Sequence, residues 1–217
     1  MRKYVIAALC CLLSLFALTG CKSSVPENTV FSVDDLSGKK IGVQLGTTGD
    51  TLVSEYEDDG SGTVVERYNK GNDAIQALKQ GKVDAVVIDI QPAKAFTEAN
   101  PDLTILEEEF VNEDYALCIS KSRPELKASI NEAIRALKEN GTLDNILKNY
   151  IGEDAGKTPY VTPEGTEHSN GTLVMATNAY FKPYEYYEGG KIVGIDVDMA
   201  TAIADYLGMN LKIEDME

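Results

Sequence analysis

From residue 39 onward, short apolar runs alternate with segments whose hydrophobic residues fall at helical spacing. Apolar runs rich in Val, Ile and Leu indicate buried strands, and a 3.6-residue period indicates helices. The strands predicted in this part are Lys40–Leu45, Thr63–Tyr68, Val83–Asp89, Leu103–Leu106 and Tyr115–Ser120. The helices predicted between them are Thr48–Glu57, Asp73–Gln80 with Asn72 as its N-cap, and Pro92–Ala99. This alternation predicts a parallel, doubly wound α/β sheet.

The rest of the chain contains two helices, an irregular stretch and a second α/β segment. Helices are predicted at Pro124–Asn140 and Leu143–Tyr150, and residues 153–170, rich in glycine, proline and polar side chains, read as a linker. The final segment is predicted to contain strand Thr172–Thr177, an aromatic stretch Tyr180–Tyr187, a turn at Gly189-Gly190, helix Asp196–Leu207 and strand Asn210–Ile213.

The N-terminus has the features of an export leader. A basic pair is followed by the uncharged run Tyr4–Leu18, which is too short to span a bilayer comfortably, and the run ends in Leu18-Thr19-Gly20-Cys21. That ending is similar to a bacterial lipobox, in which Cys21 would be acylated. We therefore expect residues 1–21 to be a lipoprotein signal peptide, residues 22–35 a tether, and the protein to be lipid-anchored on the outer face of the cytoplasmic membrane.

Charge and composition narrow the possible chemistry. The chain has 35 acidic and 20 basic residues, a formal net charge of −15, which disfavours binding to nucleic acid. It has one histidine, His168, so a multi-histidine zinc site is excluded. Cys118 is the one cysteine left in the expected fold, where we predict it to be buried in a strand, and no disulfide is possible. We expect no metal and no cofactor.

One strand–helix junction carries a candidate anion site. Gly46-Thr47-Thr48-Gly49-Asp50 offers free backbone N–H groups and two hydroxyls at the carboxyl end of a strand, where open α/β sheets bind ligands. A loop that only caps the helix is the alternative. Asp89 ends a neighbouring apolar strand, where an unpaired charge is costly. Together these groups would suit a zwitterion, with its carboxylate at Thr47 and Thr48 and its ammonium on Asp89.

Three other motifs are better explained without a ligand. The segment Gly152–Thr158 lacks the spacing of a phosphate-binding loop and follows a helix, not a strand. Asp196 and Asp198 begin a predicted helix, so capping explains them better than a metal site does. His168 lies in the predicted linker and is expected to be solvated.

Several of these segments together resemble the polar amino-acid binding proteins of ABC importers, solute-binding family 3. The matching runs are Gly42–Asp50, Ala77–Asp89, Asn140–Tyr150, Gly171–Glu185 and Gly194–Asp198. The resemblance implies a periplasmic-binding-protein-like type 2 fold, with two α/β lobes that close over an amino acid. It also implies a monomer that docks on the ABC permease, with no catalytic residue.

The family's roles can be carried onto this chain position by position. The resemblance places the ligand α-carboxylate on Thr48 and the α-ammonium on Asp89. Asn178 matches a position that is often acidic near the ligand, and Tyr180 or Phe181 matches the aromatic residue that packs on the ligand side chain.

The lobe order departs from the family pattern. The resemblance assigns residues 36–113 to the second lobe, 114–152 to a return segment that packs on the first lobe, 153–170 to a linker and 171–217 to the start of the first lobe. The first lobe is thus permuted and incomplete, and its carboxylate-clamping arginine has no counterpart among Arg2, Arg67, Arg123 and Arg135. Closure is expected to pivot about residues 109–115.

Other functions remain open at this point. A dehydratase-like enzyme on the same fold would need a poised carboxylic acid, for which Asp89 and Glu185 are the candidates. A sensory ligand-binding domain and a fragment that binds nothing are further alternatives.

Overall fold

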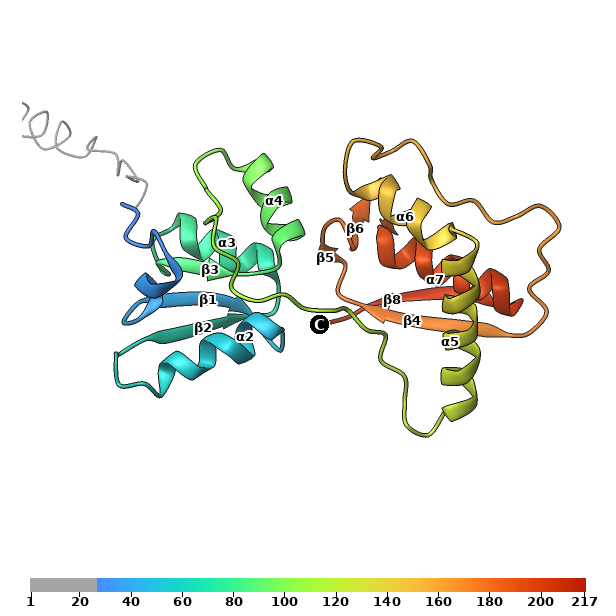
Figure 1. Ribbon diagram of the computed structural model, residues 1–217, viewed down its shortest axis with the longest axis horizontal. Coiled ribbons are helices and arrows are strands. Elements are labelled where there is room, and N and C mark those ends of the chain that lie inside the picture. Colours follow the sequence, from blue (N-terminus) through green and yellow to red (C-terminus); the bar gives the residue numbers. More distant parts are fainter. Residues whose placement is uncertain (1–26) are drawn as a thin grey trace, which may run out of the picture.

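Two α/β lobes lie side by side in the computed structural model, which describes residues 27–217 (Figure 1). We call residues 30–106 the N-terminal lobe, residues 107–119 the crossover segment and residues 120–217 the C-terminal lobe. The chain passes between the lobes through the crossover segment (Figure 1). The predicted signal peptide, Cys21 and the first residues of the predicted tether lie outside the described residues.

The N-terminal lobe is built on a parallel sheet with strand order β2-β1-β3. In register, Ile41 of β1 lies opposite Val65 of β2 and Ala85 of β3. The strands are β1 (Lys40–Gln44), β2 (Val64–Tyr68) and β3 (Ala85–Val87). The helices are η2 (Val33–Leu36), α2 (Thr48–Val53), η3 (Ser54–Glu57), α3 (Gly71–Lys79) and α4 (Ile90–Ala99).

The core of this lobe lies around the central strand. Ile41 and Val43 are fully buried and pack with Val53 and with residues from the segment before β1. Val30 is only 4% exposed and belongs to this core. The expected tether is therefore wrong from Val30 onward, because burial of that apolar side chain fixes the segment to the lobe.

The C-terminal lobe combines a parallel strand pair with an antiparallel meander. Strand β4 pairs with β8, and β5, β6 and β7 follow one another in an antiparallel sheet. The strands are β4 (Thr172–Thr177), β5 (Tyr180–Phe181), β6 (Glu185–Glu188), β7 (Lys191–Val193) and β8 (Asn210–Asp215). The helices are α5 (Pro124–Glu139), α6 (Thr142–Tyr150) and α7 (Ile195–Leu207).

Helices far apart in the sequence share one core in this lobe. Apolar residues of α5 and α6, among them Ile130 and Ile146, pack with Ile195 and Ile203 of α7. In Figure 1 the helix pair α5–α6 lies beside α7 and the β4–β8 pair. The two segments that flank the predicted linker therefore build one lobe.

Two predicted strands are wrong. Residues 103–106 and 115–120 lie in no strand, since neither segment has a ladder partner among the described residues. Without a neighbouring strand an apolar run gains no ladder hydrogen bonds, whatever its propensity. Tyr115 and Leu117 are consequently more than half exposed, and Cys118 is exposed, not buried as expected.

Three local expectations are also corrected. The N-cap of α3 is Lys70, not Asn72. Asp196 and Asp198 lie in the first turn of α7 but make no capping hydrogen bond; Asp198 instead accepts one from Tyr150 at 2.9 Å. His168 is half-buried, with Nε2 at 2.7 Å from Asp205, so it is not fully solvated.

Neither a bilayer-crossing helix nor a metal-type cluster of acidic, histidine and cysteine side chains occurs between residues 27 and 217. The helices there are too short or too polar to span a membrane. No group of three or more such side chains is placed to hold a metal ion.

Candidate functional site

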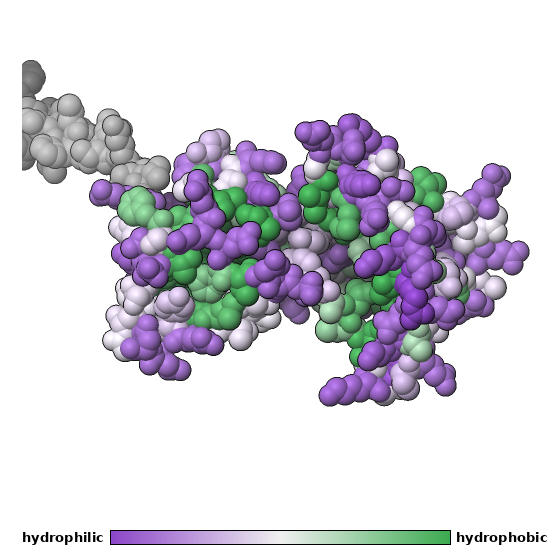
Figure 2. Space-filling view, in the orientation of Figure 1, coloured by the Kyte–Doolittle hydropathy of each residue, from purple (hydrophilic) through white to green (hydrophobic). Residues whose placement is uncertain are grey.

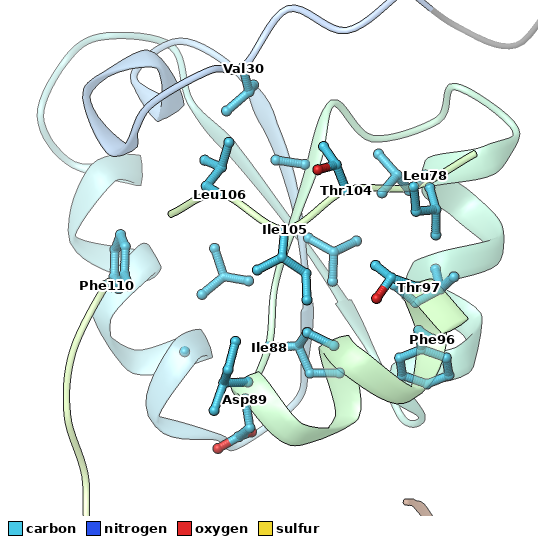
Figure 3. Close-up of a pocket in the computed structure, with 18 of the residues that line it drawn as sticks. Val30, Leu78, Ile88, Asp89, Phe96, Thr97, Thr104, Ile105, Leu106 and Phe110 are labelled. Carbon is cyan, nitrogen blue, oxygen red and sulfur yellow. The ribbon is translucent and has the colours of Figure 1, made fainter. Parts of the chain in front are cut away.

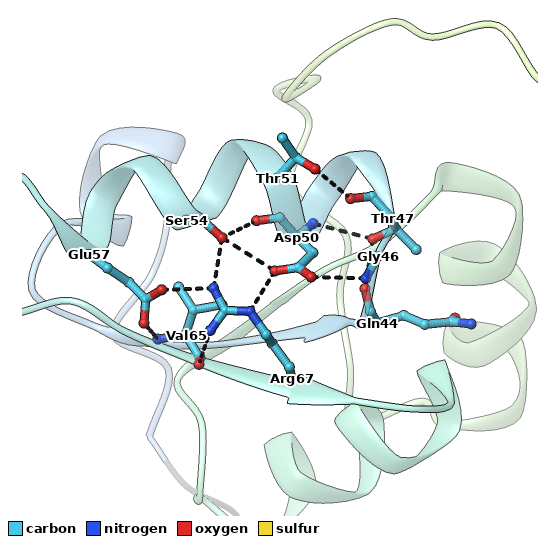
Figure 4. A network of polar contacts seen from close by, with 9 residues as sticks. All are labelled: Gln44, Gly46, Thr47, Asp50, Thr51, Ser54, Glu57, Val65 and Arg67. Atoms are coloured by element: carbon cyan, nitrogen blue, oxygen red, sulfur yellow. Dashed lines mark hydrogen bonds and ion pairs between the residues drawn. The ribbon is translucent and has the colours of Figure 1, made fainter. Parts of the chain in front are cut away.

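The loop after β1 is fixed by its own hydrogen bonds. Gly46 has a φ of 77°, which favours glycine, and its N–H donates to the Asp50 carboxylate at 2.9 Å. The Thr47 hydroxyl donates to the Gln44 carbonyl at 2.8 Å and accepts from the Asp50 N–H at 3.2 Å (Figure 4). Thr47 is thus the N-cap of α2, and its hydroxyl is already used within the loop.

A partly buried ion pair supports this loop from β2. Arg67 on β2 places Nε 2.8 Å from Asp50 Oδ1, and its Nη2 donates to both Glu57 and Ser54 at 2.7 Å each (Figure 4). Burial opposes ionisation of Asp50, but the hydrogen bonds from Gly46 and Arg67 outweigh it and lower the pKa of that carboxyl. The loop that presents Thr48 therefore rests on a charged network.

Asp89 lies at the carboxyl end of β3, beside that loop. It begins α4 but makes no capping hydrogen bond, and its Oδ1 accepts from the Tyr115 hydroxyl at 2.5 Å. Tyr115 belongs to the crossover segment. Desolvation and the neighbouring carboxylate together raise the pKa of Tyr115 well above its usual value, so it remains a donor at physiological pH.

A second carboxylate, Glu113, lies near both Thr48 and Asp89. A hydrogen bond from Thr48 lowers the pKa of Glu113, whereas contact with Asp89 and burial raise it, and the net shift is upward. Glu113 and Asp89 line the same groove as Thr47. The carboxylate of Glu113 thus lies close to both groups that the sequence assigned to a ligand's carboxylate and ammonium.

Aromatic rings of the C-terminal lobe complete this arrangement. The Tyr184 ring meets Tyr115 edge-on with ring centroids 4.8 Å apart, and Phe181 stacks on Tyr184 at 5.9 Å. We call the set Thr48, Asp89, Glu113, Tyr115, Phe181 and Tyr184 the inter-lobe site. It draws on both lobes and the crossover segment, and it combines carboxylates, a hydroxyl and aromatic faces.

Two of the predicted ligand residues lie in a separate contact between the lobes. Asn178 donates to the Asn69 carbonyl at 3.1 Å, and the Tyr180 ring carries the Lys70 ammonium 3.9 Å from its centroid. Lys70 also lies 3.5 Å from the Glu217 carboxylate. These contacts tie residues 69 and 70, just before α3, to β5 and to the residues that follow β4 and β8.

Glu185, the residue after Tyr184, forms an acidic pair with Asp196. Glu185 is 8% exposed, and its Oε2 has no hydrogen-bond partner among the described residues. Burial first, and then the neighbouring Asp196, raise the pKa of Glu185 to about 8. Gly194 has a φ of 136°, and its backbone passes close to the backbone of Tyr184. An added Cβ would lie 2.1 Å from the Tyr184 carbonyl oxygen, so only glycine fits there.

The structure therefore brings together part of the predicted site. Thr48, Asp89 and Phe181 belong to the inter-lobe site, Thr47 caps the adjoining helix, and Asn178 and Tyr180 lie at the second contact. Sequence reasoning missed Glu113, Tyr115 and Tyr184. Glu113 and Tyr115 lie in residues 109–115, to which the sequence analysis assigned only the pivot of lobe closure.

No arginine within residues 27–217 reaches the inter-lobe site. Arg67 is bound to Asp50 and Glu57, while Arg123 and Arg135 are exposed on the C-terminal lobe. A ligand carboxylate would rely on Thr48 and the backbone of the loop that carries it. A hydrogen bond to a charged group contributes about 1.5–3 kcal/mol.

Relatives with known roles align with roughly half of their own length. The chain is 28% identical over 132 residues to the L-cystine-binding protein TcyJ of Escherichia coli (strain K12), a match that covers 60% of this chain and 48% of that protein. It is 33% identical over 130 residues to an L-arginine-binding protein of Pseudomonas aeruginosa, covering 55% of this chain and 49% of that protein. The chain thus spans about half the length of these relatives.

Solved structures agree with the sequence matches. An ancestral arginine-binding protein bound to arginine superposes with a TM-score of 0.54 at 38% identity, covering 58% of this chain and 56% of the other. The substrate-binding protein of an amino acid ABC transporter gives a TM-score of 0.51 at 26% identity, over 58% and 55% of the two chains. These matches confirm the predicted fold class, a periplasmic-binding-protein-like type 2 α/β fold, for the part of the chain that they cover.

The family match extends over both lobes of the chain. A model of the bacterial extracellular solute-binding proteins, family 3, matches residues 62–153 and 173–217, more than half of the sequence. The matched residues include Asp89, Glu113 and Tyr115 in the first block and Phe181 and Tyr184 in the second. The chain therefore belongs to the bacterial extracellular solute-binding proteins, family 3.

Proposed function

We propose that this chain binds an amino acid at the inter-lobe site and delivers it to the permease of an ABC importer. The observation that carries the proposal is the juxtaposition of Thr48 and Asp89 at the carboxyl ends of neighbouring parallel strands, closed from the other lobe by Tyr184 and Phe181. Ligands of open α/β sheets bind at this edge. The relatives named as amino-acid-binding proteins support the same ligand class.

The proposed roles follow from charge and geometry. The ammonium of the ligand replaces the Tyr115 hydroxyl as the partner of Asp89, and the ligand carboxylate replaces Glu113 at Thr48. Phe181 packs on the ligand side chain. Binding then draws the lobes together, because the contacts of both lobes are made only in the closed form.

The wider role that we propose follows the family. The chain acts by binding and release, without catalysis, as an extracytoplasmic monomer. It is anchored to the membrane by a lipid on Cys21, and its partners are the amino acid and the permease subunits. Residues 36–113 form the family's second lobe, 114–152 the return segment, 153–170 the linker and 171–217 the start of the first lobe.

Thermal unfolding with each amino acid in turn tests the proposal. A ligand at a hundred times its dissociation constant stabilises the fold by about 2.7 kcal/mol, or roughly 5–11 °C for a chain of this size. We expect such a shift with one class of amino acid. A cooperative transition that no amino acid moves would contradict the proposal.

A pair of variants assigns the binding to the site. Asp89→Asn removes the charge that we assign to the ammonium, and Asp114→Asn removes an exposed charge nearby in the crossover segment. The thermal shift should disappear in the first variant and persist in the second. An equal shift in both variants would show that the ligand binds elsewhere.

A further inference from the structure

The lobes touch at the inter-lobe site and at a second contact outside it. Asp89 of the inter-lobe site lies at one end of a groove of about 840 Å³, most of which belongs to the N-terminal lobe (Figure 3). The second contact joins Asn69 and Lys70 to Asn178 and Tyr180. In the space-filling view the lobes meet at a narrow junction (Figure 2). A single contact at such a junction has a large influence on how the lobes are arranged.

Both sides of the second contact lie at the carboxyl ends of parallel strands. Asn69 and Lys70 follow β2, and Asn178 follows β4. Tyr180 begins β5. Ligands of open α/β sheets bind at these edges. The contact therefore joins the two ligand-binding edges of the chain directly, side chain to main chain and side chain to side chain. We call Asn69, Lys70, Asn178 and Tyr180 the lobe latch.

The latch combines a cation–π contact with hydrogen bonds. The Lys70 ammonium lies 3.9 Å from the centroid of the Tyr180 ring, well inside the distance of about 6 Å at which a ring face attracts a cation. The Asn178 amide donates to the Asn69 carbonyl at 3.1 Å, and the Asn69 amide donates to the Glu217 carboxylate at 2.9 Å. Helix α3, which begins directly after Lys70, lies against β5.

The Tyr180 ring is held in place by its own lobe. It packs on Tyr187 with ring centroids 5.8 Å apart, and the Tyr187 hydroxyl donates to the Asp215 carboxylate at 3.0 Å. The other oxygen of that carboxylate accepts from the Ala179 N–H at 3.0 Å. Because the ring is already fixed, little conformational entropy is lost when Lys70 comes to lie over it.

A second cation–π contact provides an internal control. The Lys182 ammonium lies 5.1 Å from the centroid of the Tyr186 ring. Both residues belong to the C-terminal lobe, so this contact does not cross the junction. The chain thus contains the same chemistry once between the lobes and once within a single lobe.

We propose that the lobe latch holds the two lobes together in the absence of a ligand, with Lys70 and Tyr180 as its positioning residues. When only the closed arrangement is competent, the apparent affinity for a ligand is reduced by the fraction of chains that are closed. The latch raises that fraction before a ligand arrives, and so acts on affinity without touching the ligand. This consequence rests on the proposed function, whereas the latch itself does not.

Proton NMR of the chain without ligand detects the latch directly. Protons above the face of an aromatic ring are shielded. The ε-methylene signal of Lys70, identified by its loss in Lys70→Arg, should therefore lie upfield of ordinary lysine signals and return to their position in Tyr180→Leu. A Lys70 signal at the ordinary position in the original chain, or one that Tyr180→Leu leaves unmoved, would overturn the latch.

Small-angle X-ray scattering of the ligand-free chain tests whether the latch holds the lobes together. Lys70→Gln removes the cation that crosses the junction, and Lys182→Gln removes the matched cation within one lobe. Loss of a cation–π contact at an exposed site lowers the ratio of closed to open chains about two- to fivefold. The radius of gyration should rise in the first variant and stay unchanged in the second. A radius that neither variant changes, or that both raise alike, would overturn the proposal.

Conservative variants separate the cation–π contact from a general loss of packing. Lys70→Arg keeps a cation and Tyr180→Phe keeps a ring face, so both should retain the original radius. Tyr180→Leu removes the ring face and should raise the radius. A radius raised alike in all three variants would contradict the assignment of the latch to this contact.

A binding measurement connects the latch to affinity and keeps it distinct from the proposed function. Scattering without ligand decides on the latch even when no amino acid binds. For the amino acid that gives the largest thermal shift, the dissociation constant of Lys70→Gln should rise by the factor by which that variant lowers the closed fraction. That of Lys182→Gln should not change. An affinity unaffected by Lys70→Gln, in a chain whose radius has risen, would overturn the role of the latch in binding.

Discussion

Replacement of Arg67 by alanine tests whether the loop that carries Thr48 depends on charge pairing. Arg67 donates to the Asp50 carboxylate, which in turn accepts from the Gly46 N–H and so fixes the loop. The side chain of Asp50 is 11% exposed and that of Arg67 34% exposed. The variant leaves a nearly buried carboxylate without its cation.

The magnitude follows from that burial. Removal of one partner from a fully buried pair costs about 3–5 kcal/mol, and surface pairs contribute about 0–1 kcal/mol. Because a third of Arg67 is exposed, water partly compensates Asp50, and we expect a loss of about 2 kcal/mol. With a urea dependence of about 1–3 kcal/mol per M, the midpoint should fall by roughly 1 M.

Urea unfolding of Arg67→Ala, Asp50→Asn, their double variant and the control Arg135→Ala provides the assay. Arg135→Ala, which removes an exposed arginine from α5, should change stability by less than about 0.5 kcal/mol. In the double variant Arg67→Ala/Asp50→Asn, loss of the buried charge should recover part of the stability that Arg67→Ala costs. A negligible effect of Arg67→Ala, or a double variant in which the losses simply add, would refute the reasoning.

The same pair gives the chain a defined response to acid. The folded-state pKa of Asp50 is lowered below its ordinary value of 3.8. Its contribution is therefore present above that value and is lost as the pH falls through the lower, folded-state pKa. Removal of Arg67 should reduce this acid dependence.

Three further predictions concern the C-terminal lobe and the crossover segment. Because the pKa of Glu185 is raised to about 8, stability should fall as the pH rises from about 4.5 toward 8, and Glu185→Gln should flatten that slope in urea unfolding at pH 5 and pH 8; an unchanged slope would contradict it. Gly194→Ala should cost several kcal/mol, of order 3, since its Cβ would overlap the Tyr184 carbonyl, and a change below about 1 kcal/mol would show that the backbone there relaxes. Cys118 is exposed and should react with a thiol reagent in the folded chain. Reaction only after denaturant is added would contradict this and support the buried strand predicted from the sequence.

Local periodicity explains which elements could be predicted. Strand β1 and helices α5 and α7 were found because each buries its own apolar residues within one lobe. Leu103–Leu106 has the same kind of sequence as a strand, but a strand exists only with a partner, and pairing is not encoded within the segment. The same holds for Cys118, whose burial depended on a pairing that the structure lacks.

The site was predictable where topology decides it. Thr48 and Asp89 follow two parallel strands, and the carboxyl ends of such strands meet at one edge, so their proximity could be inferred. Tyr115 and Tyr184 lie about seventy residues apart, and their edge-on contact depends on how the lobes pack. The role of Glu113 beside Asp89 likewise depends on the path of the crossover segment, which no local pattern specifies.

Calorimetric titration with one amino acid and two of its analogues tests the central claim most directly. The claim is that Thr48 and Asp89 hold the two charges of a zwitterion. For the amino acid that gives the largest thermal shift, the analogues lacking the α-ammonium or the α-carboxylate should each bind at least about tenfold more weakly, since loss of a charge-assisted hydrogen bond costs about 1.5–3 kcal/mol. Asp89→Asn should weaken binding of the amino acid and leave binding of the analogue without an ammonium unchanged. If both analogues bind as tightly as the amino acid, the inter-lobe site does not recognise a zwitterion.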